Sequence, residues 1–109
     1  MLNTYPKPDV IIIQEHRLSH IDYTEWVPQL EFMKGPIFWN AAVYSAREDS
    51  LADGTAILTS HKLAEGITAH GVIVRSRVQY IILERSRAIK TGILNIYSPN
   101  YTRFRSNLW

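Results

Sequence analysis

The hydrophobic pattern of this chain predicts strands more often than helices. Asp9–Gln14 is a continuous β-branched run that does not alternate with polar residues. Such a run is typical of a strand that is covered on both faces. Further strands are predicted at residues 54–59, 72–75, 79–83 and 91–97. We expect residues 10–13, 56–58 and 93–96 to form one connected sheet with mostly buried side chains.

The segments between these runs predict few helices. Asp22 and Glu25 have the spacing of a capping box, and Pro28 follows too late for a first turn, so we expect a short helix in 22–34 that breaks near Pro28. Residues 38–44 are predicted to be extended and 46–53 to form a loop. Residues 84–90 are short enough for a hairpin loop. A last helix is predicted to begin in residues 102–109.

Composition restricts the class of protein. The chain has 109 residues, 46% hydrophobic and 20% charged, which is the balance of one small globular domain. No apolar run approaches the length of a membrane helix, and the first residues do not resemble a signal peptide, so no membrane partner is expected. Cysteine is absent, which excludes disulfides and thiolate metal sites. We therefore expect an intracellular protein, and leave nucleus and cytoplasm open.

The distribution of charge is more informative than the total. The net charge is only +2. Basic residues nevertheless dominate residues 75–105, where Glu84 is the only acid. They are Arg75, Arg77, Arg85, Arg87, Lys90, Arg103 and Arg105. This bias favours an anionic partner, although each residue could equally be a solvated strand end.

Glu15 is the first candidate for chemistry. It follows Ile11–Ile13 and Gln14, so its carboxylate lies at the end of a predicted buried strand. A charge in that position is costly unless it is paired or bound to a cation. Mg²⁺ is commonly held by one or two carboxylates together with water and phosphate, so Glu15 is a candidate metal ligand. The alternative is a structural salt bridge to Arg17 or another base.

Tyr97 and Asn100 form the second candidate. Tyr97 ends a predicted strand and Asn100 follows the turn that Pro99 fixes, so a hydroxyl and an amide come near one point. Both groups can donate hydrogen bonds to phosphate oxygens. The alternative is ordinary turn chemistry, in which proline and asparagine are common.

Three segments together resemble a known family. They are Asp9–Glu15 (DVIIIQE), Gly54–Leu58 (GTAIL) and Leu94–Asn100 (LNIYSPN). In this order and at about these separations they resemble the endonuclease/exonuclease/phosphatase family, whose members include deoxyribonuclease I. The resemblance implies an α/β (α+β) fold, namely a partial four-layer sandwich of mixed or antiparallel sheets with few helices. It also implies hydrolysis of phosphodiesters with Mg²⁺ or Mn²⁺.

Site roles follow from the resemblance residue by residue. Glu15 matches the metal-ligand glutamate, Tyr97 the active-site tyrosine, and Asn100 the asparagine after the proline. Substrate-binding roles are expected for His16, Arg103 and Arg105. The segment around Trp39 most resembles the endonucleases of non-long-terminal-repeat retrotransposons. That branch implies a nucleic-acid partner, DNA before RNA, and a parent chain that can carry a reverse transcriptase domain.

The family pattern extends beyond these residues. Its first strand with an Asn, its Gly-Asp-Phe-Asn segment and its late Asp-His pair have no match in the sequence. We therefore expect residues 1–109 to be one partial domain that lacks the first strand and the carboxy-terminal half, and to be inactive alone. The alternatives are an inert remnant, a nucleic-acid-binding module, and a fragment of a small-molecule phosphoesterase of the same fold.

Overall fold

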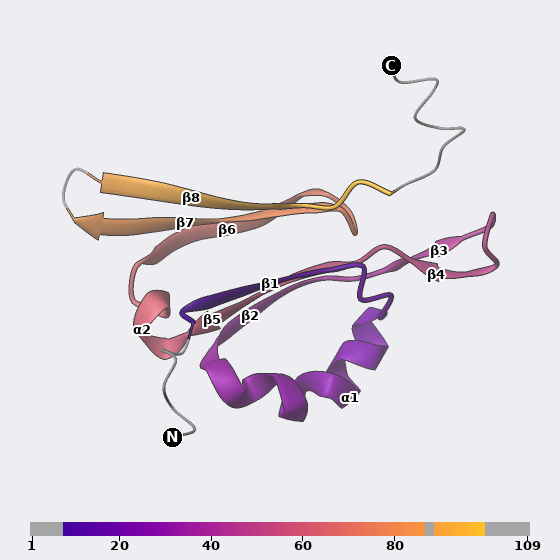
Figure 1. The fold of residues 1–109 in the computed structure, drawn as a ribbon, viewed down its shortest axis with the longest axis horizontal. Coiled ribbons are helices and arrows are strands. Elements are labelled where there is room, and N and C mark those ends of the chain that lie inside the picture. The colour runs from indigo at the N-terminus through magenta and orange to yellow at the C-terminus, as the bar shows by residue number, and fades with distance from the viewer. Residues whose placement is uncertain (1–7, 87–88, 100–109) are drawn as a thin grey trace, which may run out of the picture.

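Two antiparallel sheets lie face to face, and one helix covers the outside of one of them (Figure 1). This architecture comes from a computed structural model, which describes residues 8–86 and 89–99. The expected helix at 102–109 lies outside the described residues. So do the candidate residues Asn100, Arg103 and Arg105.

The first sheet has the strand order β1-β5-β2. Its strands are β1 (Val10–Gln14), β5 (Thr55–Ser60) and β2 (Lys34–Asn40). Both pairings are antiparallel, and Ile57 in the central strand lies opposite Ile12 on one side and Phe38 on the other. Because side chains alternate along a strand, these three residues face the second sheet, and their neighbours face the helix.

The helix layer closes the outer face of the first sheet. It consists of α1 (His20–Leu30) and a short 3₁₀ helix, η1 (Glu31–Met33). Met33, Ala56 and Leu58 are buried between this layer and the sheet. The partly buried residues packed around them are Ile11, Ile13, Leu30, Ile37 and Trp39. Removal of this apolar surface from water is what attaches α1 to the sheet.

The start of α1 differs from the prediction. The N-cap is Ser19, whose Oγ accepts from the backbone N–H of Asp22 at 3.0 Å, while Asp22 Oδ2 accepts from the backbone N–H of Ser19 at 3.0 Å. The capping box is therefore Ser19–Asp22, and the predicted pair Asp22–Glu25 was wrong. Pro28 does not break the helix, which continues to Leu30. Proline removes a single backbone donor near the end of the helix, and the tertiary contacts of this layer outweigh that loss.

One short element joins β2 to β5 within the first sheet, and another joins the two sheets. Strands β3 (Val43–Ser45) and β4 (Ser50–Ala52) form a hairpin that extends beyond the body of the molecule (Figure 1). The predicted loop at 46–53 is therefore partly a strand. After β5, the one-turn helix α2 (His61–Ala64), capped by Ser60, leads the chain across to the second sheet.

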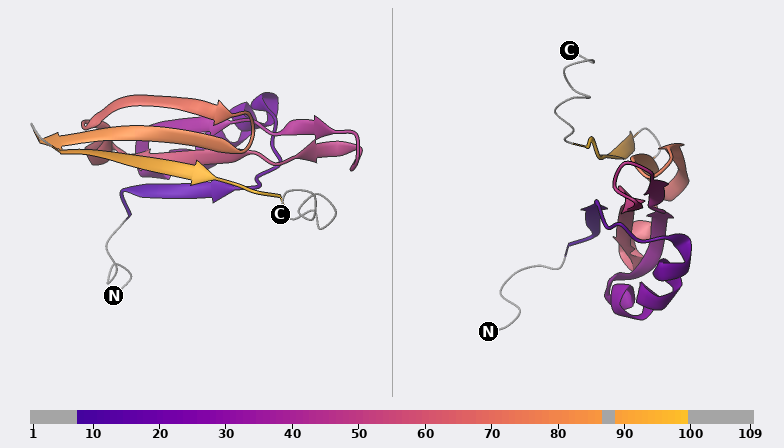
Figure 2. Two further views of the ribbon diagram at one scale, coloured as in Figure 1. Left: turned by 90° about the horizontal axis from the view of Figure 1, so that it is seen from above. Right: turned by 90° about the vertical axis from the view of Figure 1, so that its right-hand side faces the viewer.

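The second sheet is a meander of three consecutive strands (Figure 2). These are β6 (Ile67–Val74), β7 (Val78–Ser86) and β8 (Ile89–Ile96). The expected hairpin between β7 and β8 is confirmed. Buried and less buried residues alternate along β7, where Gln79, Ile81 and Leu83 are buried. These three side chains face the first sheet.

The prediction of one connected sheet was wrong, because β8 belongs to the second sheet. An apolar run shows that a strand is covered but does not show which strand it pairs with. Here the crossover at α2 separates β8 from β1 and β5, and sequential strands then pair with each other. The prediction of full burial was also wrong, since β1 is an edge strand and Ile12 is 45% exposed.

The coarse fold prediction is confirmed. The chain is a small mixed α/β domain, with mostly antiparallel strands and few helices. In the part of the chain that the structure describes, no helix is long and apolar enough to cross a membrane.

The outer face of the second sheet carries no helix among the described residues. Ile73, Leu94 and Ile96 are 61%, 51% and 53% exposed. Ile73 and Leu94, with Tyr80, Ile82, Gly92 and Ile93, line a shallow depression of about 380 Å³. The two sheets therefore have very different outer faces.

Candidate functional site

A buried polar network joins the two sheets at the end where β1 and β8 finish. Its centre is Asn95 of β8, which is 1% exposed. The Asn95 Nδ2 lies 3.1 Å from each of three acceptors, namely the carbonyl oxygens of Ile13 and Ala56 and Oε1 of Gln79. An amide nitrogen carries two hydrogens, so these acceptors share them. One side chain of the second sheet is thus bonded to two strands of the first.

Gln14 completes the connection from the other side. Its Nε2 donates to Oδ1 of Asn95 at 3.1 Å and to the carbonyl oxygen of Ile96 at 2.5 Å. Glu15 follows Gln14 and Tyr97 follows Ile96 directly. The hydrogen bonds of Gln14 therefore bring the ends of the two candidate strands together.

Glu15 and Tyr97 lie at the same end of the two sheets, but they follow strands of different sheets. The expectation of a common sheet was wrong. Glu15 pairs with Arg17. Glu15 Oε1 accepts from Arg17 Nη2 at 3.2 Å, and Glu48 of the β3–β4 hairpin accepts from the same nitrogen at 3.5 Å.

The guanidinium of Arg17 responds electrostatically to the two carboxylates. The hydrogen bond from Arg17 to Glu15 raises the pKa of Arg17 above its usual value, and the charge of Glu48 adds to this rise. The predicted salt bridge of Glu15 is therefore present. It is also exposed, since about half of each side chain is accessible to water, so the pair can separate at little cost.

His16 is engaged within the protein on one face of its ring and at both nitrogens. Its ring stacks on Trp39 with centroids 3.9 Å apart, and Trp39 stacks in turn on Tyr23 of α1 at 4.6 Å. Nδ1 accepts from the backbone N–H of Leu18 at 2.9 Å, and Nε2 lies 3.2 Å from the carbonyl oxygen of Thr55. These partners fit a neutral ring with its hydrogen on Nε2.

Burial lowers the pKa of His16, and the backbone hydrogen bonds at Thr55 and Asn40 oppose that shift in part. The ring is therefore held neutral. A hydrogen bond from His16 to a substrate requires its hydrogen bond with Leu18 or Thr55 to break. Its substrate-binding role stays a prediction.

The backbone at this end adopts several unusual conformations. Positive φ angles occur at Glu15, Arg17, Asp53 and Ser76, all non-glycine residues, and at Gly54 with φ of 98°. A Cβ at Gly54 would lie 2.3 Å from Cε1 of His16, so only glycine fits there. Conformations of this kind cost of order 1–3 kcal/mol each and persist where surrounding contacts enforce them, commonly at functional sites.

Asp53 and Arg77 are additional residues of this end, and the sequence did not indicate that they pair. Asp53 is 4% exposed, and its Oδ2 accepts from Arg77 Nε at 2.9 Å and lies 3.4 Å from Ser76 Oγ. The backbone N–H of Arg17 donates to the carbonyl oxygen of Asp53, and that of Tyr97 donates to the carbonyl oxygen of Arg77. No local motif marks Asp53, because Asp-Gly before a strand is a common turn.

Metal-binding capacity at this end is limited. Glu15 supplies one accessible carboxylate, of which one oxygen faces Arg17. Within residues 8–86 and 89–99, no group of three His, Cys, Asp or Glu side chains could hold a metal ion. Mg²⁺ in proteins is often bound by one or two carboxylates and completed by substrate phosphates. Glu15 can therefore supply one carboxylate ligand to a metal ion whose other ligands are water and substrate phosphate.

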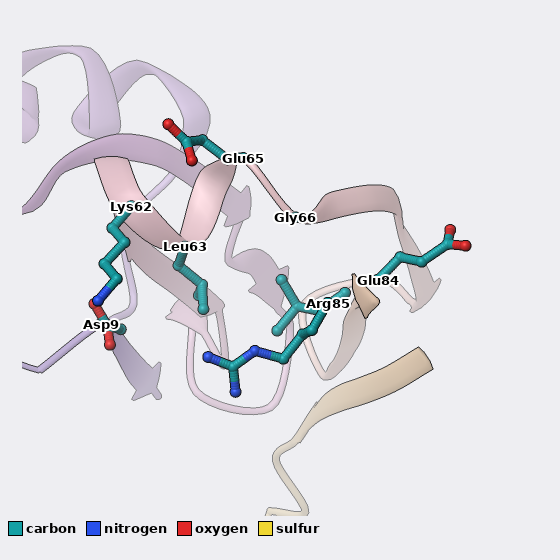
Figure 3. Close-up of a pocket in the computed structure, with 8 residues that line it drawn as sticks. Asp9, Lys62, Leu63, Glu65, Gly66, Glu84 and Arg85 are labelled. Carbon is teal, nitrogen blue, oxygen red and sulfur yellow. The ribbon is translucent and has the colours of Figure 1, made fainter. Parts of the chain in front are cut away.

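A second pocket lies at the opposite end of the sandwich (Figure 3). Its volume is about 310 Å³. The charged residues that line it carry both signs, and the carboxylate of Glu84 points away from the other labelled side chains. They are Asp9, Lys62, Glu65, Glu84 and Arg85. This mixture selects no class of ligand.

Comparison with known proteins adds no family to this description. No family model matches the chain, and neither the curated proteins nor the solved structures gave a significant match.

Proposed function

We propose that this chain is part of a divalent-metal-dependent phosphodiesterase domain that hydrolyses nucleic-acid phosphodiester bonds. The single observation that carries the proposal is the meeting of two strand ends. The strand before Glu15 and the strand before Tyr97 come from different sheets, yet Gln14 bonds directly to Asn95 and to the carbonyl of Ile96. A carboxylate that can bind a metal ion and a hydroxyl that can donate a hydrogen bond to phosphate are thereby brought to one end of the molecule.

The proposed fold is the partial four-layer sandwich of the deoxyribonuclease I type. Three layers are consistent with it, namely the α1 layer and the two sheets. The outer face of the second sheet, which no helix among the described residues covers, is where a fourth layer would belong. The resemblance of the three sequence segments is the further support for this family.

Each residue has a proposed task. Glu15 holds Mg²⁺ or Mn²⁺, which when bound neutralises charge on the phosphate and lowers the pKa of a bound water. The hydroxyl of Tyr97 donates a hydrogen bond to a non-bridging oxygen, and Asn100 supplies an amide donor by sequence analogy. His16 holds the Glu15 segment against Trp39. Arg103 and Arg105 contact neighbouring phosphates. DNA is the preferred substrate, following the retrotransposon resemblance, and a reverse transcriptase domain in the parent chain belongs to the same proposal.

A second candidate is a nucleic-acid-binding module without catalysis. The observation that favours it is the ion pair of Glu15 with Arg17, since a carboxylate engaged by a guanidinium is a weaker metal ligand. The two candidates differ in whether divalent metal strengthens binding through Glu15.

The discriminating experiment measures the affinity of a fluorescent DNA duplex with Mn²⁺ and with EDTA at constant ionic strength. We expect Mn²⁺ to tighten binding to the wild-type chain several-fold, and Glu15→Gln to abolish that gain. Glu31→Gln is the matched control, because it removes an exposed carboxylate at the far end of α1. An equal effect of Mn²⁺ on wild type and Glu15→Gln would reject the phosphodiesterase proposal in favour of the binding module.

Cleavage by this chain alone is not expected. One carboxylate is a poor magnesium site, and a positioned general base contributes about 10²- to 10⁴-fold to rate. Plasmid nicking in Mg²⁺ and in Mn²⁺ checks this expectation, with Glu15→Ala as control. Nicking that disappears in Glu15→Ala would show that these residues suffice for catalysis.

A further inference from the structure

We propose that Arg77, oriented by the buried carboxylate of Asp53, contacts a nucleic-acid phosphate beside Tyr97. This inference deepens the proposed function and rests on it for the identity of the ligand. It assigns a phosphate-contact role to Arg77 and a positioning role to Asp53. In the sequence, Arg77 is one of seven basic residues that favour an anionic partner, and nothing singles it out or marks Asp53.

The first argument is the geometry of the ion pair. Arg77 donates to Asp53 through Nε, at 2.9 Å. Among the described residues, the two terminal nitrogens of this guanidinium have no hydrogen-bond partner. A guanidinium held at Nε keeps the edge formed by its terminal nitrogens for a second anion, and that edge suits two phosphate oxygens.

The second argument is the contrast in exposure between the partners. The Asp53 side chain is 5% exposed, whereas that of Arg77 is 39% exposed. The carboxylate is thus fixed inside the protein while the cation reaches the surface. A buried anchor reduces the conformational freedom that a surface arginine loses when it binds, which favours binding.

The third argument is the location. Tyr97 donates its backbone N–H to the carbonyl oxygen of Arg77 at 2.8 Å, and Arg17 donates its backbone N–H to that of Asp53 at 2.9 Å. These backbone hydrogen bonds place Arg77 beside Tyr97 and Arg17 beside Asp53. Both arginines lie in connections outside the strands, at the same end of the sandwich. Since Glu15 and Glu48 already engage Arg17, Arg77 is the better placed of the two to receive a phosphate.

The test measures binding of a short fluorescent DNA duplex in EDTA over a series of salt concentrations. A phosphate contact contributes about one unit to the slope of log affinity against log salt. We expect Arg77→Gln to weaken binding and to reduce that slope by about one. Arg85→Gln is the matched control, because it removes the same charge at the opposite end of β7. It should change neither quantity by more than a small fraction.

Further variants distinguish the position of the Arg77 guanidinium from its charge, and both from an effect on folding. Arg77→Lys keeps the charge and should keep the slope, but it should weaken binding because lysine lacks the planar fork. Asp53→Asn keeps Arg77 and should likewise weaken binding without changing the slope. If Arg77→Gln unfolds because Asp53 is left unpaired, the double variant Asp53→Asn/Arg77→Gln removes that problem and should show the same loss of slope.

Three results would overturn the inference. They are equal losses in Arg77→Gln and Arg85→Gln, an unchanged slope in a folded Arg77→Gln chain, and no DNA binding by the wild type. Failure here is distinct from failure of the proposed function, because the measurement contains no metal. Mn²⁺ can fail to tighten DNA binding through Glu15 while Arg77 still contributes to the salt slope. Equally, Mn²⁺ can tighten binding through Glu15 while Arg77 contributes nothing to the slope.

Discussion

The two sheets of this protein are similar in size and opposite in their outer faces. The sheet β1-β5-β2 has its outer face closed by α1 and η1, where Leu58 is 1% exposed. The sheet β6-β7-β8 has an outer face on which Leu94 is 51% exposed. Most of the apolar driving force is therefore concentrated on one side of the sandwich, and the second sheet depends on its contacts with the first.

The largest expected effect is a difference between two identical substitutions. Leu58→Ala should lower the free energy of unfolding by about 2–5 kcal/mol, because it leaves a cavity under the helix layer. Leu94→Ala should cost less than about 1 kcal/mol, because water already reaches that side chain. Urea unfolding measures both. Equal costs would mean that the outer face of the second sheet is covered in solution.

The next effect concerns the interface that the two sheets share. Asn95→Ala should cost at least about 2 kcal/mol, because it leaves buried acceptors on both sheets without a donor. Thr91→Ala, on the same strand at an exposed position, is the control and should be nearly neutral. Thermal unfolding distinguishes them. A neutral Asn95→Ala would indicate that apolar contacts alone hold the sheets together.

Glycines give a third comparison between the sheets. Gly54→Ala should cost about 1–2 kcal/mol, because the residue has a positive φ and its new Cβ meets the ring of His16. Gly92→Ala on β8 should be neutral or slightly stabilising, since its Cβ would meet only Ile82 Cδ1 at 3.6 Å. Chemical denaturation of both variants checks this. An unchanged free energy of unfolding in Gly54→Ala would show that the His16 ring can move away from position 54 at little cost.

The smallest effect is a pH dependence at the end of the first sheet. The pKa of His16 in the folded chain is lowered from 6.5, so the unfolded chain binds more protons as the pH falls below about 6.5. The contribution of His16 to stability is therefore full above that pH and declines below it. Urea unfolding from about pH 5 to about pH 7.5 should show a smaller slope in His16→Gln than in wild type. Identical slopes would contradict the burial of this ring.

Sequence patterns predicted strands where local signals are strong. The β-branched run before Glu15 and the hairpin between β7 and β8 depend on neighbouring residues, and both were found. Sheet membership could not be predicted in this way, because it depends on the crossover at α2 and on pairing between distant residues. The predicted helix break near Pro28 was wrong for the same reason, because packing of the helix layer outweighed the local tendency of proline to end a helix.

The residues of the candidate site also differ in whether a local sequence signal marks them. Glu15 and Tyr97 could be found because each ends an apolar strand. Asp53 and Arg77 could not, because the burial of Asp53 exists only once the β6–β7 turn packs against the start of β5. Such a carboxylate has no distinctive sequence around it. A buried acid with an exposed basic partner becomes visible only in three dimensions.

The amide of Asn95 has a mechanical consequence. Apolar surfaces can slide past one another with little resistance, whereas hydrogen bonds hold only at one offset. Because Asn95 bonds to β1, β5 and β7 at once, the sheets cannot shift along each other without losing several bonds together. Tyr97 is two residues beyond Asn95, and Glu15 is one residue beyond Gln14. The relative position of Glu15 and Tyr97 is therefore set by this hydrogen-bond network. Substitutions that repack the apolar core should leave that position unchanged.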